Sequence, residues 1–141
     1  MEKLFIPYKT GIPVLAKEKG FNEDCLMEWK TPVAHVRDNY NKTHEVIREP
    51  NLYKDTHYGG GDSRVSYKND LSAPLYQQIT DWLREKHNIN IPYVICGSNK
   101  EVLGYKWFVQ VGMENQCYET KMIKDYYEGM TEAIKEALKL I

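Results

Sequence analysis

Apolar and polar residues follow their most regular pattern between residues 72 and 95. The apolar residues first recur at spacings of three and four, which predicts one face of a helix. The residues on this face are Leu75, Ile79, Trp82, Leu83 and Lys86. We expect Ser72 to cap this helix, with Pro74 in its first turn and His87 and Asn88 at its end. From Ile89 to Ile95 the apolar spacing changes to two, which predicts a strand.

Capping residues predict two further helices. Thr10 can cap a short helix that Gly20 ends. Asp125 begins a long C-terminal helix, and Glu128, three residues later, completes a capping box. The apolar face of this last helix contains Tyr126, Met130, Ala133, Ile134, Ala137, Leu138 and Ile141.

Alternation at a spacing of two predicts further strands. They cover Cys25–Arg37, Arg64–Lys68, Leu103–Met113 and, less regularly, Cys117–Ile123. A turn over residues 97–100 joins the third of these to the strand before it as a hairpin. Pro32 has no N–H to donate to a sheet ladder, so we expect the first strand to lie at a sheet edge or to be broken there.

This order of elements predicts an α+β fold. We expect residues 1–141 to form one domain, a mostly antiparallel sheet with two long helices and one short N-terminal helix packed on one face. Residues 38–63 look like a long irregular insertion, in which only Val46 and Ile47 suggest a short strand. Loops of this length are usually functional or mobile.

Composition excludes several classes of protein. The chain has 19 basic and 20 acidic residues and a net charge of -1, so it is no polycation that seeks phosphate backbones. Its apolar runs are far shorter than the ~18 residues that a membrane span needs. The N-terminal residues lack the apolar core of a signal peptide. We therefore expect a cytoplasmic protein with no membrane partner.

Histidine and cysteine spacings indicate no metal site. The histidines are His35, His44, His57 and His87, and the cysteines are Cys25, Cys96 and Cys117. No HxH, HExxH or CxxC pattern occurs among them. We assign no catalytic residue, no metal ligand and no cofactor from the sequence.

The segment between Asp38 and Arg64 has the composition of a ligand-binding loop. Tyrosine is abundant in the chain, at 11 of 141 residues, and several tyrosines here alternate with basic residues and a glycine run. Such glycines can form an anion nest, and tyrosine can stack on a base. The candidate ligand-binding residues are Tyr40, Arg48, Tyr53, His57, Tyr58, Gly60, Gly61 and Arg64. Nearby acidic residues almost cancel the positive charge, which disfavours a nucleic acid. A solvated turn is the alternative interpretation of this segment.

Three motifs carry a resemblance to a known group. LAKEKGF at residues 15–21, WLREKHNINI at residues 82–91 and EGMTEAIKEALKLI at residues 128–141 are similar to small uncharacterised proteins encoded by phages and prophages of gut Bacteroidetes. The resemblance covers roughly a third of the chain, and residues 38–63 depart from it. It implies an accessory protein of a phage or mobile element, located in the cytoplasm of the bacterial host.

Three functional hypotheses remain open. In the first, the protein is not an enzyme and acts by binding, either sequestering a small nucleotide of host defence or inhibiting a host protein. In the second, it is a small nuclease or phosphoesterase that uses His44, His57 and nearby acidic residues. In the third, it is an oligomerising structural protein whose edge strand pairs with a partner, including a second copy.

Overall fold

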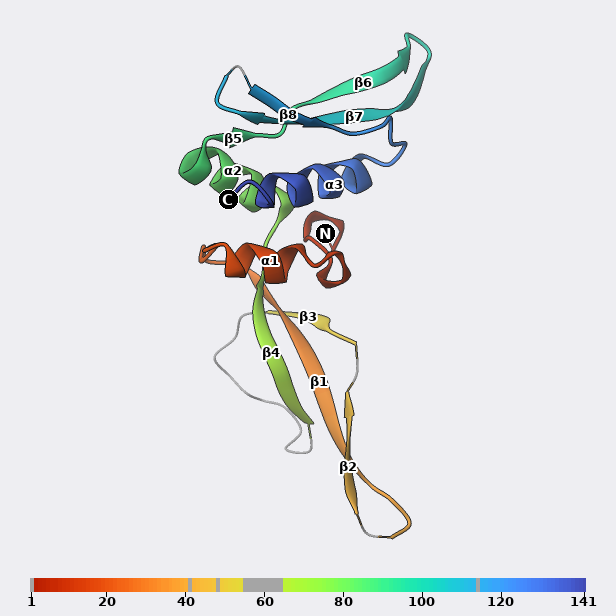
Figure 1. Cartoon of the computed structure of the whole chain (residues 1–141). Helices are drawn as coiled ribbons and strands as arrows, with labels where there is room; N and C mark the ends of the chain where they lie inside the picture. Colours follow the sequence, from red (N-terminus) through yellow and green to blue (C-terminus); the bar gives the residue numbers. More distant parts are fainter. Residues whose placement is uncertain (1, 41, 48, 55–64, 114) are drawn as a thin grey trace. The chain divides into compact units, whose positions relative to one another are not determined.

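The computed structural model describes residues 2–40, 42–47, 49–54, 65–113 and 115–141 (Figure 1). The chain divides into two compact units. One comprises Met1–Phe21 together with Leu75–Ile141, and the other comprises Asn22–Pro74. The inserted unit therefore begins earlier and ends later than the insertion expected at residues 38–63. Three α-helices and antiparallel strand pairing confirm the predicted α+β fold.

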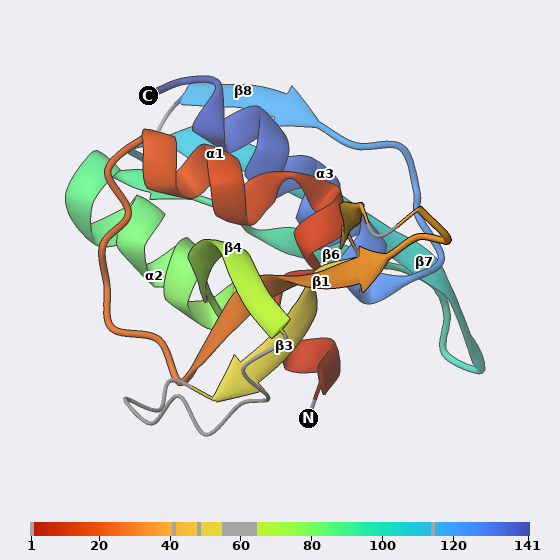
Figure 2. The same cartoon turned by 90° about the horizontal axis from the view of Figure 1, so that it is seen from below.

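The first unit contains all three α-helices that the structure describes. Its elements are the 3₁₀-helices η1 (Glu2–Leu4) and η2 (Tyr8–Thr10), the helices α1 (Ile12–Glu18), α2 (Tyr76–His87) and α3 (Tyr126–Leu138), and the strands β5 (Ile89–Asn90), β6 (Tyr93–Ser98), β7 (Glu101–Val111) and β8 (Asn115–Glu119). Helices α2 and α3 cover one face of the sheet, as predicted (Figure 1). The short helix α1 differs from the prediction, because it packs on α3, on the side away from the sheet (Figure 2).

Strand β7 is the centre of this sheet. Strands β6 and β5 pair with one of its edges, and β8 pairs with the other. The strand predicted over residues 89–95 is divided at Pro92, whose carbonyl accepts a hydrogen bond from the Phe108 N–H at 2.9 Å. Trp107 and Val109 point from β7 into the core and are almost fully buried. Each such side chain stabilises the fold by roughly 1.5–3 kcal/mol.

Tertiary pairing changes where helix α2 begins. Ser72 belongs to β4 and pairs with Glu28, so the predicted serine cap is wrong. The helix begins at Tyr76 instead, and the Leu75 N–H donates to Gln78 Oε1 at 2.9 Å. The end at Asn88 is confirmed, since this residue has the left-handed φ of 56° that asparagine tolerates.

Of the other two predicted caps, the cap of α3 is formed and the cap of α1 is not. Asp125 accepts a hydrogen bond from the Glu128 N–H at 2.8 Å, which confirms the cap of α3. The N-cap of α1 is Gly11, and Thr10 lies one residue before it, where its Oγ1 accepts from the Ile12 N–H at 3.2 Å. Local polar spacing therefore identifies the start of α3 correctly, because its capping bond is formed within a few residues.

The second unit is a separate antiparallel sheet of β1 (Met27–Arg37), β2 (Thr43–Ile47), β3 (Asn51–Lys54) and β4 (Val65–Ala73). Strand β1 is central, with β4 along one edge and both β2 and β3 along the other. The expectation that Pro32 marks an edge strand is wrong. The strand is not broken there either, because β1 runs from Met27 to Arg37 and Pro32 pairs with Tyr67 of β4. Along the other edge, Pro32 falls in a gap between the β3 pairs at residues 27–30 and the β2 pairs at residues 33–37. A proline can occupy that gap since no N–H is needed there.

Candidate binding site

The starts of α2 and α3 lie side by side in the first unit. From these starts, the two helices run in the same direction (Figure 1). Tyr76, the first residue of α2, stacks at 5.1 Å on Tyr127, the second residue of α3. The Tyr76 hydroxyl also lies 2.7 Å from Thr131 Oγ1. These contacts hold the two helix N-termini together.

Six aromatic side chains form a continuous cluster around these helix starts, which we call the aromatic cluster. Its members are Tyr76, Tyr93, Tyr105, Trp107, Tyr126 and Tyr127. Tyr126 is its centre, with ring centroids 4.9 Å from Trp107 and 5.1 Å from Tyr127. Most contacts are edge-to-face, the arrangement that aromatic quadrupoles favour. The cluster extends from the buried face of β7 to the surface, where Tyr93 is 42% exposed.

A cavity of about 170 Å³ opens at the edge of this cluster. It is lined by Leu4, Leu75, Tyr76, Gln77, Tyr126, Tyr127 and Met130, all from the first unit. Leu4 and Gln77 are exposed, so the cavity is open to solvent beside them. An engineered cavity of about 150 Å³ is large enough to hold benzene. The volume therefore suits one aromatic ring.

The lining of the cavity is uncharged. Burial raises the pKa of Tyr76 above its ordinary value, against the opposing effect of its hydrogen bond with Thr131. Burial also raises the pKa of Tyr126, and neighbouring tyrosines add to the rise. Both phenols thus stay neutral at physiological pH. They offer ring faces and hydroxyl groups to a ligand, and no formal charge.

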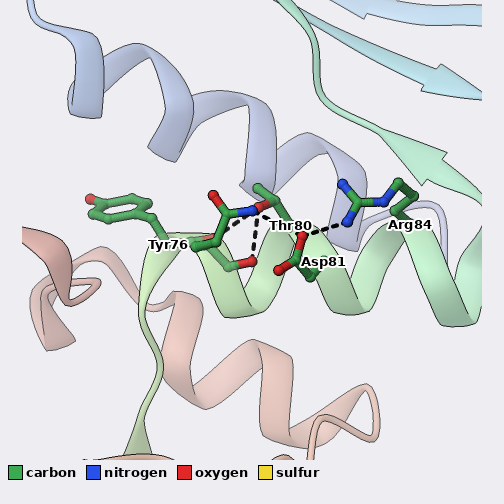
Figure 3. A network of polar contacts seen from close by, with 5 residues as sticks. Tyr76, Thr80, Asp81 and Arg84 are labelled. Carbon is green, nitrogen blue, oxygen red and sulfur yellow. Dashed lines mark hydrogen bonds and ion pairs between the residues drawn. The ribbon is translucent and has the colours of Figure 1, made fainter.

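The outer face of α2 carries a local polar network beside the cavity. Gln77 Nε2 donates to Asp81 Oδ1 at 2.9 Å, and Arg84 donates to the same oxygen. Figure 3 shows Arg84 turned toward Asp81, whereas the ring of Tyr76 points away from the network. The only guanidinium in this network is thus paired within its own helix, and it does not line the cavity.

The sequence-predicted site lies largely outside the described residues. Arg48, His57, Tyr58, Gly60, Gly61 and Arg64 fall there. Tyr53 is half-buried on β3 and pairs with Glu28, near the start of β1. Tyr40 is 85% exposed and follows the other end of β1. At about 3.3 Å per residue the two tyrosines lie roughly 30 Å apart along that strand, so they do not share a site.

One histidine–carboxylate pair bears on the enzyme hypothesis. His44 Nε2 lies 2.6 Å from Asp38 Oδ2, and this hydrogen bond, together with backbone donors, lowers the pKa of Asp38. Asp38 Oδ1 also accepts from the N–H groups of Tyr40 and Lys42, each at 2.9 Å. The carboxylate therefore organises the turn between β1 and β2. His57, the second histidine of that hypothesis, lies outside the described residues.

The cavity residues were not identified as a site from the sequence. The tyrosine abundance was a usable signal, because Tyr76, Tyr126 and Tyr127 all stand within two residues of a helix start. Among the described residues, no group of three or more His, Cys, Asp or Glu side chains could hold a metal ion. Across the same ranges, no helix combines the length and apolar character needed to cross a membrane.

Comparison with known proteins gives no relative. No protein-family model, curated protein or solved structure matches this chain.

Proposed function

We propose that this protein acts by binding, and that its cavity receives one flat, uncharged side chain of a partner protein. The observation that supports this proposal is the cavity of about 170 Å³ that three tyrosines line at the paired starts of α2 and α3. Tyrosine and tryptophan side chains are the commonest anchors in protein interfaces. An aromatic anchor would stack on the half-buried rings of Tyr126 and Tyr127 and displace water from an apolar lining.

The size of the cavity favours an anchor side chain over a free nucleotide. Small-molecule sites usually measure roughly 300–1,000 Å³ and enclose most of the ligand. A cavity of this volume can enclose a single ring but neither the sugar nor the phosphates of a nucleotide. Among the described residues, no lysine or arginine lines it to pair with a phosphate. A protein partner needs only a pocket of one ring, because the rest of its surface can contact the surroundings.

The identity of the partner is proposed from the resemblance alone. If the chain is an accessory protein of a phage or mobile element, the partner is a host protein in the bacterial cytoplasm. The sequestration of a defence nucleotide is the competing version, and the same experiment distinguishes the two.

The proposal is tested by titration with N-acetyl-tryptophanamide, an uncharged substitute for an anchor residue, followed by saturation-transfer NMR. We expect binding on the order of 1 mM, the affinity of a single weakly enclosed ring. Leu4→Trp should fill the cavity and weaken this binding at least tenfold. Leu140→Trp is the matched control, because Leu140 is 49% exposed, Leu4 is 48% exposed, and only Leu4 lines the cavity.

A parallel titration with AMP tests the nucleotide version. Binding of AMP that Leu4→Trp abolishes, without binding of N-acetyl-tryptophanamide, would replace the partner-protein proposal with the nucleotide one. Binding of neither probe, or equal loss of binding in both tryptophan variants, would overturn the role of the cavity.

A further inference from the structure

Strand β6 is an edge strand that no described strand covers. It pairs only with β7, and five of its six residues are exposed. Its sequence, YVICGS, contains no charged residue and no proline. Apart from the two-residue β5, every other described strand carries at least one charged side chain. Charges and prolines on edge strands are the usual protection against pairing with another chain, and β6 has neither.

The backbone groups that face outward can be identified from the hydrogen bonds. The Phe108 N–H donates to the Pro92 carbonyl, and Tyr105 instead bonds to Ile123 on the other side of β7. Hydrogen-bonded pairs alternate along an antiparallel ladder. Val94 and Cys96 therefore turn their N–H and C=O groups toward β7, whereas Tyr93 and Ile95 turn theirs toward the free edge.

We infer that β6 pairs antiparallel with β6 of a second copy of this chain, about a two-fold axis at Val94. In this register the outward groups of Tyr93 on one copy bond to those of Ile95 on the other, and the reverse. Tyr93 and Ile95 side chains then lie opposite each other on one face, where aromatic and β-branched pairs are favourable. The pairing would cover apolar side chains that are 42–61% exposed in the single chain.

A second copy fits this edge better than an unrelated strand because of the absence of charge. In a two-fold pair the residues next to the axis lie close to their own copies, so a charged residue there would meet a like charge. A strand of six uncharged residues avoids this repulsion. Since β6 is short, the contact is small against the ~1,200–2,000 Å² of stable interfaces, so we expect a reversible dimer.

Sedimentation velocity of the full chain, under reducing conditions and across the micromolar range, tests the inference. We expect the mass to rise from the 16.6 kDa monomer toward twice that value. Ile95→Pro removes an outward N–H without breaking a bond to β7, and it should raise the dissociation constant at least tenfold. Ile95→Val keeps the N–H and should dimerise like the original chain.

Ile95→Lys provides a second disruption if the proline variant fails to fold, as judged by circular dichroism. It keeps the backbone donor but adds a charge to each copy, and it should also remain monomeric. A strict monomer over the whole range, or dimerisation of both the proline and the lysine variants, would overturn the inference. Open-ended aggregation without a dimer plateau would also overturn it, because the two-fold dimer leaves no free β6 edge for a third copy.

Discussion

The close contact between α3 and the sheet gives the sharpest stability prediction. A Cβ added to Gly129 would lie 2.4 Å from Trp107 Cδ1 and 2.6 Å from Trp107 Nε1. Carbon atoms in contact are normally about 3.5–4.0 Å apart, so the indole would have to withdraw by about 1 Å. Trp107 is 1% exposed and packs on Tyr93 and Tyr126, which leaves it little room to move.

Gly129→Ala should therefore destabilise the protein although alanine is the better helix former. Replacing a helical glycine by alanine alone would stabilise by about 1 kcal/mol. Overpacking a rigid core costs about 1–3 kcal/mol, and an overlap of this depth belongs at the upper end. The net change is a loss of about 2 kcal/mol in the free energy of unfolding. With a urea m-value of about 2 kcal/mol/M, the unfolding midpoint should fall by about 1 M.

Circular dichroism at the helix band is the suitable signal, because all three described α-helices belong to the first unit. Trp107→Phe supplies the control, since phenylalanine lacks Nε1 and its smaller ring has room to withdraw from the new methyl group. The Trp107 Nε1 has no hydrogen-bond partner among the described residues, so this change breaks no such bond. Gly129→Ala should cost much less when it is combined with Trp107→Phe. A Gly129→Ala variant as stable as the original chain, or more stable, would refute this packing argument.

Three further predictions concern single groups. The hydrogen bond to Glu132 raises the pKa of Tyr118 to about 12. The stability that this bond contributes is therefore complete below about pH 10 and is lost as pH rises through 12. Absorbance titration of Glu132→Gln should show this tyrosine ionising at lower pH. Burial, with nearby acidic residues, raises the pKa of Cys25 to about 11. Mass spectrometry at pH 8 should therefore find the exposed Cys117 alkylated well before Cys25, and equal alkylation rates would contradict this. Asn88→Val should lower stability by about 1–2 kcal/mol in thermal unfolding because Asn88 adopts a left-handed φ, whereas Asn88→Gly should be close to neutral.

Local patterns identified the elements whose determinants lie within a few residues. The hairpin of β6 and β7 and the cap at Asp125 are examples, because a short turn and a bond to the Glu128 N–H decide them. Ser72 shows the opposite case. It has the sequence signature of a helix cap, but pairing with Glu28, 44 positions earlier, keeps it in a strand. No local pattern contains that partner.

The candidate site also could not be predicted from local patterns, because contacts between residues far apart in the sequence form it. The sequence places Tyr76 at the start of one helix and Tyr126 and Tyr127 at the start of another. Only the parallel packing of these helices brings the three rings to one cavity. The division of the strands into two sheets was missed for a related reason, since alternation reveals which residues form a strand but not which strand they pair with.

Ligand binding in the cavity can be observed directly through the methionine that lines it. Met130 is the methionine that lines it and is 7% exposed, whereas Met113 is 96% exposed and lies elsewhere on the first unit. Protein with ¹³C-labelled methionine methyl groups, with Met130 assigned through Met130→Leu, would be titrated with N-acetyl-tryptophanamide. We expect nuclear Overhauser contacts between the indole protons and the Met130 methyl group, and none to Met113. An unchanged Met130 signal at saturating probe would contradict this expectation.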